Sequence, residues 1–157
     1  MRPGIEVLQI LDPVRRQSTA RAVLEDLPEW FGIPEAREAY IRDSAHQLFF
    51  EARSGGVPIG FLCLHETGRD TLELSVMGVK KGFHRCGAGS ALFAQAKAEA
   101  ARLGYSFLQV KTVQMGRYDE YDQTNRFYLS LGFKEFEVFP TLWDEWNPCQ
   151  VYVMALR

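Results

Sequence analysis

The stretch from His84 to Ser90 has the residue types of a loop that binds a phosphate group. Its two glycines leave the backbone accessible to a diphosphate, and Arg85 adds a fixed positive charge with several hydrogen-bond donors. The apolar run 71–79 precedes the stretch, and the Ala-rich segment 90–103 follows it. A strand, a glycine-containing turn and a helix bring unpaired backbone N–H groups and the positive end of a helix dipole to one point, which favours anions.

The residues after Gly87 and Gly89 exclude two of the commoner phosphate loops. A P-loop requires Gly-Lys followed by Ser or Thr, whereas Gly89 is followed by Ser90 and Ala91. A dinucleotide-binding loop requires a third small residue three positions after its second glycine, and that position is Leu92. The pattern predicts a phosphate-bearing ligand that is neither a nucleoside triphosphate nor NAD. A plain surface turn before a helix is the alternative.

The elements that would position this loop follow from turn residues, helix-start signals and the spacing of apolar residues. We expect strands 47–53, 57–65 and 71–79 to form an antiparallel meander, and strands 71–79 and 106–113 to form a parallel pair joined by a right-handed crossover helix. The remaining expected elements are strand 5–10, a helix from Asp12-Pro13 to about Leu27, a helix over 35–45 opened by Pro34, helix 90–103 ended by Gly104, a short helix 125–131 capped by Thr124, and strands 133–139 and 150–156.

Length and composition indicate one soluble globular domain over residues 1–157. The net charge of −2 gives no argument for nucleic acid or an anionic membrane surface as a partner. No segment has the length of a membrane span or the pattern of a targeting signal. Three widely spaced cysteines favour a reducing compartment, and we expect a cytoplasmic protein. The three histidines show no metal-ligand spacing, so we expect no metal site.

Two motifs and the order of the elements resemble the GNAT superfamily of acetyl-CoA-dependent N-acetyltransferases. The loop signature of that family, Gln/Arg-x-x-Gly-x-Gly/Ala, is met by His84-Arg85-Cys86-Gly87-Ala88-Gly89, with His84 in place of Gln or Arg. A second signature, a Tyr four residues before Gly-Phe, is met by Tyr128 and Gly132-Phe133. The resemblance implies an α/β fold of the GNAT type: a mixed, mostly antiparallel sheet of about six or seven strands with a splayed parallel pair, flanked by about four helices.

The resemblance also implies a binding site for acetyl-CoA. The pantetheine arm would lie along the end of strand 71–79 like an added strand, on backbone groups of Met77, Gly78 and Val79, and Gly78 would fit a bulge there. Alternatively, Gly78 simply ends the strand. Asn125 resembles the family's polar contact to the cofactor arm, with a solvent-facing helix residue as the alternative. The diphosphate would bind the loop residues His84, Arg85, Cys86, Gly87, Ala88, Gly89 and Ser90.

Two residues carry the catalytic roles that the resemblance implies. Tyr128 resembles the family's general acid, which gives a proton to the departing thiolate, and a packed core tyrosine is the alternative. Glu73 is a base-like residue on strand 71–79 that would act through water, because a half-buried carboxylate has the raised pKa that suits base chemistry. An outward-facing strand residue is the alternative for Glu73. A backbone N–H near Met77 would stabilise the oxyanion.

The expected acceptor is a primary amine of a small molecule or a peptide. Trp30, Phe31 and Trp143 are candidate substrate-binding residues that would form aromatic walls, although core packing is the alternative for the first two. Acidic residues at 119, 120, 122, 144 and 145 would attract a cationic amine if they converge, and otherwise are solvated loop charges. A non-catalytic CoA-binding module and an acyltransferase for longer acyl chains are alternative functions. The sequence leaves open whether the chain forms a homodimer.

Overall fold

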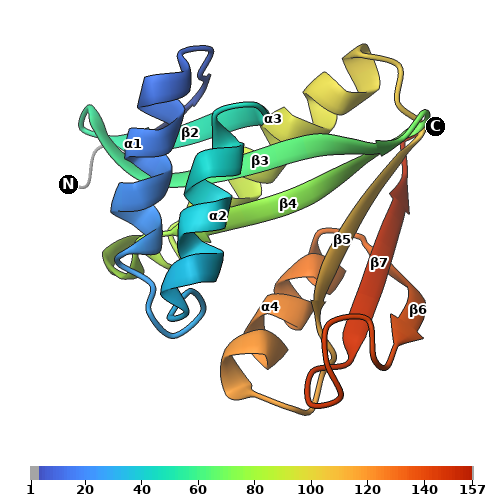
Figure 1. The fold of residues 1–157 in the computed structure, drawn as a ribbon. Coiled ribbons are helices and arrows are strands. Elements are labelled where there is room, and N and C mark those ends of the chain that lie inside the picture. The colour runs from blue at the N-terminus through green and yellow to red at the C-terminus, as the bar shows by residue number, and fades with distance from the viewer. Residues whose placement is uncertain (1–3, 157) are drawn as a thin grey trace. The chain divides into compact units, whose positions relative to one another are not determined.

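The computed structural model describes residues 4–156 and contains seven strands, four α-helices and one 3₁₀ turn in that range (Figure 1). In chain order these are β1 (Ile5–Gln9), α1 (Pro13–Leu24), α2 (Pro34–Ser44), β2 (Leu48–Ser54), β3 (Val57–Gly68), β4 (Thr71–Val79), η1 (Lys81–Phe83), α3 (Ala88–Arg102), β5 (Phe107–Val113), α4 (Asp119–Ser130), β6 (Lys134–Phe139) and β7 (Cys149–Ala155).

Hydrogen bonds link the seven strands in the order β1-β2-β3-β4-β5-β7-β6. The β1–β2, β2–β3, β5–β7 and β6–β7 pairs are antiparallel. The β4–β5 pair is parallel, with a register that runs from Thr71 beside Phe107 to Leu74 beside Val110. The expected mixed sheet with a parallel pair, flanked by four helices, is therefore confirmed.

The chain divides into two compact units. Unit 1 comprises residues 4–65 and 75–99, and unit 2 comprises residues 66–74 and 100–156. The strand β4 and the helix α3 each contribute residues to both units. The predicted cofactor loop lies in unit 1, whereas Tyr128 and Glu73 lie in unit 2.

Unit 1 packs α1 and α2 side by side on its strands (Figure 1). The helix α1 begins where the sequence predicts, because the Asp12 side chain accepts a hydrogen bond from Val14 N and Pro13 occupies the first helical turn. Apolar residues of both helices form one core with the strands beneath them. That core contains Ile10, Ala20, Val23, Leu24, Leu27, Ile41, Phe49, Phe61, Cys63 and Val76.

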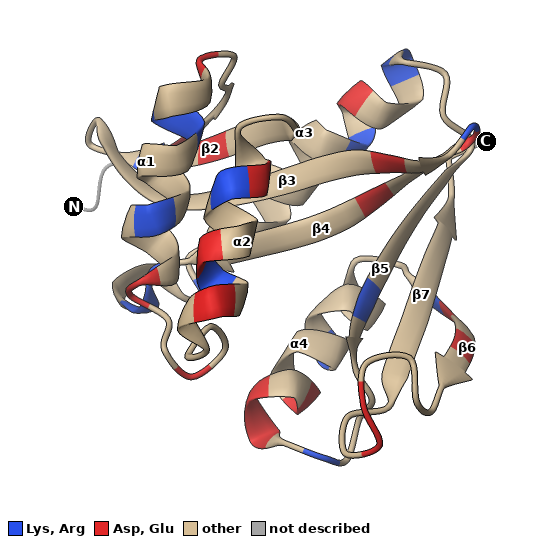
Figure 2. Ribbon diagram, viewed as in Figure 1, with Lys and Arg blue, Asp and Glu red and all other residues tan. Residues whose placement is uncertain are grey.

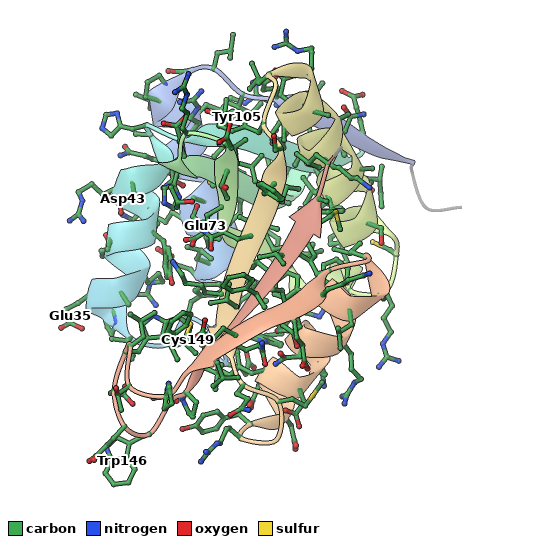
Figure 3. All side chains as sticks on the ribbon, turned by 90° about the vertical axis from the view of Figure 1, so that its right-hand side faces the viewer. Glu35, Asp43, Glu73, Tyr105, Trp146 and Cys149 are labelled. Atoms are coloured by element: carbon green, nitrogen blue, oxygen red, sulfur yellow. The ribbon has the colours of Figure 1, made fainter. Side chains whose placement is uncertain are left out.

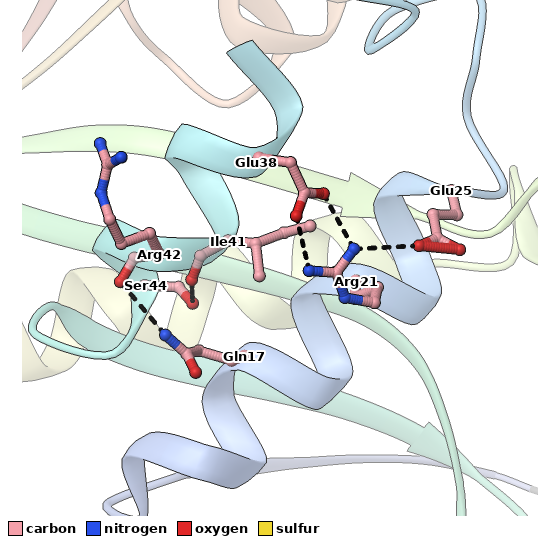
Figure 4. Close-up of polar contacts among 7 residues, drawn as sticks. All are labelled: Gln17, Arg21, Glu25, Glu38, Ile41, Arg42 and Ser44. Carbon is pink, nitrogen blue, oxygen red and sulfur yellow. Dashed lines mark hydrogen bonds and ion pairs between the residues drawn. The ribbon is translucent and has the colours of Figure 1, made fainter. Parts of the chain in front are cut away.

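Polar contacts join α1 to α2 along their exposed edges (Figure 4). The guanidinium of Arg21 donates to both carboxylate oxygens of Glu38, over 2.7 and 2.8 Å, and also contacts Glu25. This pairing holds the pKa of Glu38 below its usual range. The side-chain amide of Gln17 donates to the backbone carbonyl of Arg42 over 3.5 Å. These contacts lie between exposed side chains, so they add less to the packing of the two helices than the apolar core beneath them.

A charged side chain, Glu51 of β2, is completely buried in unit 1. Its carboxylate accepts hydrogen bonds from Arg15 over 3.0 Å, from Arg53 and from the hydroxyl of Thr19. A buried carboxylate is tolerated only when its oxygens are paired in this way, and removing one partner of such a pair typically costs about 3–5 kcal/mol. Glu51 therefore ties the start of α1 to the strand under it.

Unit 2 packs α4 on one face of β5 and β7 (Figure 1). The predicted short helix 125–131 is wrong at its start, because α4 begins at Asp119. Three acidic residues in its first turn, Asp119, Glu120 and Asp122, stabilise the positive end of the helix dipole, and Figure 2 shows this acidic turn. Thr124 does not cap the helix; its hydroxyl donates to Glu120 O over 3.1 Å from within α4.

The other expected elements agree with the structure to within about three residues, the usual uncertainty of element ends. The largest differences are at β3, which continues to Gly68 rather than ending at His65, and at α1, which ends at Leu24 rather than near Leu27. The helix α3 covers the other face of the unit 1 strands, where a Cβ at Gly60 would lie 3.4 Å from Leu92. None of the helices within 4–156 combines the length and the apolar character needed to cross a membrane.

Candidate active site

The turn between β4 and α3 contains two residues with positive φ. Arg85 has a φ of 62°, and it is the one non-glycine residue with positive φ among residues 4–156. Gly87 has a φ of 89°. A non-glycine residue in this region costs on the order of 1 kcal/mol, and such conformations concentrate at ligand sites. The loop expected to bind the diphosphate is therefore a turn with an uncommon backbone conformation.

The start of α3 supplies free backbone donors to this turn. The first intrahelical hydrogen bond joins Ala91 N to Gly87 O over 3.0 Å. The N–H groups of Ala88, Gly89 and Ser90 come before that bond and have no acceptor within the helix. A Cβ at Gly87 would meet no atom within 4 Å, so the space at this glycine is open. The unpaired N–H groups, the positive end of the helix dipole and the open space at Gly87 together fit the binding of a phosphate group.

His84 and Cys86 each contact backbone carbonyl groups in or next to the turn, His84 from an exposed position and Cys86 from a half-buried one. The Nε2 atom of His84 lies 2.6 Å from the carbonyl oxygen of Val79, and its ring stands edge-on to Trp30 at 6.0 Å between centroids. The thiol of Cys86 donates to the carbonyl oxygen of Phe83 over 2.6 Å. The structure thus brings His84, Val79 and the predicted substrate residue Trp30 together within unit 1.

The end of β4 packs tightly against α1. Burial alternates along the strand, with Gly78 buried and Met77 and Val79 half-buried. A Cβ at Gly78 would lie 2.9 Å from Leu27 Cδ1 and 3.1 Å from Val23 Cγ1. The glycine therefore lets α1 approach this strand closely. The bulge at Gly78 and the cofactor contacts of residues 77–79 stay predictions.

Tyr128 lies in the aromatic interior of unit 2 and is only 6% exposed. Its ring meets Phe133 nearly at right angles at 5.9 Å and is tilted against Tyr152 at 6.3 Å. One turn earlier on α4, Asn125 is completely buried and accepts a hydrogen bond from the Tyr152 hydroxyl over 2.5 Å. The Asn125 amide donates to Val113 O and Tyr121 O, so both of these contacts tie α4 to itself and to β5. The contact of Asn125 with the cofactor arm stays a prediction.

Glu73 of β4 is ion-paired. The Lys111 ammonium lies 2.7 Å from its carboxylate, and the two side chains are 33% and 13% exposed respectively. Leu74 pairs with Val110, and Val110 pairs with Tyr152, whose hydroxyl reaches α4. Because paired residues share a face and neighbours along a strand alternate, Glu73 lies on the face of unit 2 opposite α4.

The candidate substrate residues lie in both units. Trp30 and Phe31 of unit 1 are half-buried and pack on the core formed with α1 and α2, and Phe31 also stands edge-on to Tyr40 at 5.8 Å. Trp143 of unit 2 is 47% exposed. It belongs to the loop between β6 and β7, from whose tip Trp146 projects in Figure 3.

Asp144 gives that loop a fixed conformation. One carboxylate oxygen accepts hydrogen bonds from the backbone N–H groups of Trp146 and Asn147, over 2.8 and 2.9 Å, and from the Asn147 amide. These donors lower the pKa of Asp144, the side-chain amide having the largest effect. Asp144 is therefore occupied with its own turn. Similarly, Asp122 accepts from Gly116 N over 2.7 Å.

Comparison with known proteins decides the family. The sequence model of the acetyltransferase (GNAT) family matches residues 12–133, which is most of the chain and includes both signatures. The chain belongs to the GNAT acetyltransferase family. It is therefore an acetyltransferase, a member of the acyltransferase class.

Solved structures at low sequence identity share the fold of this acetyltransferase. A protein from Desulfovibrio desulfuricans described as a GNAT acetyltransferase has 19% identity and a TM-score of 0.79, over 98% of this chain and 100% of that one. An aminoglycoside 6'-N-acetyltransferase complexed with coenzyme A has 18% identity and a TM-score of 0.74, over 98% and 97%. The ribosomal-protein-S18-alanine N-acetyltransferase from Escherichia coli has 16% identity and a TM-score of 0.76, over 98% and 94%. No curated protein sequence matches the chain.

Two residues that contact predicted site residues were missed by the sequence analysis. Lys111 and Tyr152 sit on β5 and β7, and each binds a predicted site residue. The residues around each of them have the pattern of an ordinary strand. Only the register between neighbouring strands shows that Lys111 lies near Glu73 and that Tyr152 faces α4. A parallel pairing of 71–74 with 107–110 was the one signal that could have placed Lys111 near Glu73.

Proposed function

We propose that this acetyltransferase transfers the acetyl group of acetyl-CoA to a primary amine of a small molecule or a peptide by direct attack. The observation that carries the proposal is the start of α3, where the N–H groups of Ala88, Gly89 and Ser90 follow the open turn at Gly87. These groups, with Arg85, would bind the diphosphate. Met77, Gly78 and Val79 would hold the pantetheine arm through their backbone.

The two catalytic roles fall to residues of unit 2. Acetyl-CoA supplies a thioester, a reactive acyl carbon with a good leaving group. Glu73 would take the proton of the substrate ammonium through a water, which leaves the neutral amine free to form the new C–N bond. A backbone N–H near Met77 would stabilise the negative charge on the carbonyl oxygen. As the carbonyl re-forms and the C–S bond breaks, Tyr128 would give its proton to the departing sulfur, and the second proton of the attacking nitrogen would pass to water.

The acceptor site is proposed from aromatic and acidic residues. Trp143 is half-exposed on a loop whose shape Asp144 fixes, so its ring is available as a wall for a substrate. Trp30 and Phe31 are also proposed as substrate-binding residues, on the evidence of unit 1 alone. Related folds act on an aminoglycoside and on a ribosomal protein, which supports an amine acceptor but not one size of acceptor. Glu145 and the acidic first turn of α4 would favour a cationic amine.

The organisation of the chain and its location in the cell are part of the proposal. The family match at residues 12–133 runs through both units, so we propose that they act as one acetyltransferase domain over residues 1–157. All three cysteines are free, which fits the reducing conditions of the cytoplasm. A homodimer is a further proposal, and the mass of the chain in solution tests it.

Release of free thiol from acetyl-CoA, measured over a panel of amines, tests the proposed activity. The panel should contain aminoglycosides, polyamines and peptides with free N-termini, and propionyl and longer thioesters should be compared with acetyl. Acetylated product from at least one amine supports the proposal. Calorimetric CoA binding without turnover on any amine would favour a CoA-binding module, and a preference for long thioesters would change the acyl donor. If the protein shows no CoA binding and no turnover, the assignment of the loop is refuted.

A further inference from the structure

The connector between α1 and α2, residues 25–33, contacts the segment between β4 and α3 at three points. This segment, residues 80–90, is called the cofactor turn below because the predicted diphosphate-binding loop lies in it. The backbone N–H of Lys81 donates to Asp26 over 2.8 Å, and its ammonium donates to Glu29 over 2.6 Å. The third point is the edge-on contact between the rings of Trp30 and His84, with an angle of 76° between their planes. All three contacts lie within unit 1, and they come from the segment that carries the proposed substrate residues Trp30 and Phe31.

His84 is the residue through which the turn reaches both of its neighbours. A carbonyl oxygen only accepts hydrogen bonds, so the 2.6 Å contact with Val79 O requires a hydrogen on Nε2 of His84. The same ring contacts Trp30 on the connector. The residue after it, Arg85, takes the positive φ that begins the phosphate loop. One imidazole thus touches the end of β4 and the connector at the entrance of the loop.

The three contacts differ in how strongly they connect the cofactor turn to the connector. The Lys81–Glu29 ion pair is between half-exposed side chains, at 47% and 42%, and such pairs are weak in water. The backbone bond from Lys81 to Asp26 is also on the exposed surface. The ring of His84 is also exposed, but its partner Trp30 is half-buried and packs on the core of unit 1. Of the three contacts, the one between His84 and Trp30 therefore joins the turn to a side chain of the core.

We propose that His84 is a positioning residue that couples occupation of the phosphate loop to the α1–α2 connector, rather than a phosphate ligand. The proposal rests on the proposed function, because it concerns how that site communicates. A ligand that favours one arrangement of residues 85–90 also favours the His84 arrangement that keeps Trp30 in place. By linkage, the affinity for an amine at Trp30 and Phe31 then depends on the bound cofactor, and the dependence is reciprocal.

The coupling can be read from Trp30 itself. The chain has three tryptophans, so the background Trp143→Phe with Trp146→Phe leaves Trp30 as the one fluorescent tryptophan. CoA is titrated into this background with His84 intact, with His84→Gln, which can keep a donor to Val79 O, and with His84→Ala. Calorimetry gives the CoA affinity of each variant in parallel. Thermal melts confirm that each variant is folded, and Lys81→Ala is the matched control in the same turn.

The expected result is a change of Trp30 emission on CoA binding that is lost in His84→Ala, while the CoA affinity falls less than about threefold, as fits loss of a group that does not touch phosphate. His84→Gln should restore part of the response, and Lys81→Ala should keep it. Trp30→Ala and His84→Ala should raise the amine KM by amounts that do not add in the double variant. Loss of CoA binding in His84→Ala, or a full Trp30 response in that variant, would overturn the proposal.

The intact background separates this proposal from the proposed function. CoA binding by calorimetry with no Trp30 response overturns the coupling alone. A Trp30 response without turnover on any amine leaves the coupling supported and counts against the catalytic proposal. No CoA binding at all refutes both the cofactor site and the coupling that depends on it.

Discussion

The side-chain ammonium of Lys111 lies 2.7 Å from a carboxylate oxygen of Glu73, and the two residues come from the parallel strands β4 and β5. Cys149 lies in the same part of unit 2, and its pKa is raised, chiefly by burial. The ion pair gives Glu73 a fixed position and a partner of opposite charge. A base at this point must act from a carboxylate that a lysine already orients, which makes Lys111 a positioning residue for the proposed proton transfer.

Replacement of either residue of this pair tests that arrangement. We expect Glu73→Gln to lower kcat by about 100-fold, the size of effect typical of losing a general base, with little change in CoA affinity. Lys111→Met should lower kcat as well, because the carboxylate loses the group that orients it. Steady-state kinetics with calorimetric CoA binding measures both. Gln109→Ala is the control on the same strand face, where the side-chain amide donates to Thr67 Oγ1 over 2.7 Å, and it should retain activity. Full activity of Glu73→Gln would remove Glu73 from the mechanism.

Tyr128→Phe removes one hydroxyl from an aromatic cluster and leaves the ring volume unchanged. Tyr128 is 6% exposed among Phe133 and Tyr152, so the phenylalanine should pack in the same place. If the hydroxyl protonates the departing thiolate, kcat should fall by about 100-fold while CoA affinity stays within about twofold. Tyr118→Phe, at a residue 43% exposed, is the control. Equal losses in kcat and affinity would indicate a structural tyrosine.

Sequence patterns predicted those parts of the fold that depend on neighbouring residues. The start of α1 follows from Asp12 and Pro13, and its cap forms as expected. The start of α4 was missed because a run of acidic residues was interpreted as a solvated loop, although the same charges favour the beginning of a helix. The extension of β3 to Gly68 was missed for a related reason, since polar residues after His65 do not alternate with apolar ones.

In the candidate site, too, features set by neighbouring residues were predictable, and contacts between distant segments were not. The turn at Gly87 and the helix after it were predictable because glycine pattern and helix composition are local signals. The partners of the site residues were not predictable, because they depend on strand register and on contacts between distant segments. Lys111 beside Glu73, Tyr152 on Asn125 and Trp30 against His84 are all of this kind.

Gly89→Glu tests the phosphate loop directly. A carboxylate at this position would place negative charge among the N–H groups that should meet the diphosphate, so we expect CoA affinity to fall by at least about 100-fold. Gly82→Glu is the matched control, because it adds the same charge in η1, where a Cβ meets no atom within 4 Å. Calorimetry with CoA measures both variants. Unchanged affinity in Gly89→Glu would contradict the loop assignment.

Gly60→Ala tests the close packing of β3 on β4. A Cβ at Gly60 would lie 2.9 Å from the backbone oxygen of Gly78, and a backbone atom cannot rotate away as a side chain can. We expect the free energy of unfolding to fall by about 1–3 kcal/mol, which lowers Tm by about 2–12 °C. Gly68→Ala, with no atom within 4 Å of the new Cβ, should change Tm much less. Equal Tm values for the two variants would show that β3 moves freely to accept the methyl group.

Thiol labelling tests both the core and the loop in one experiment. Cys63 and Cys149 are buried, and burial raises the pKa of each thiol, whereas Cys86 is half-buried in the cofactor turn. In the native chain at pH 8, iodoacetamide followed by mass spectrometry should therefore modify Cys86 first, and CoA should slow that reaction because it covers the turn. Labelling of Cys63 or Cys149 as fast as Cys86 would contradict the burial of the core thiols, and a Cys86 rate that CoA leaves unchanged would contradict the proposed position of the cofactor.

The two buried thiols, Cys63 and Cys149, also predict how stability depends on pH. They stay protonated in the folded chain but ionise near pH 8.5 when unfolded, so the free energy of unfolding should fall as the pH rises above that value, and the fall should be smaller in Cys149→Ala.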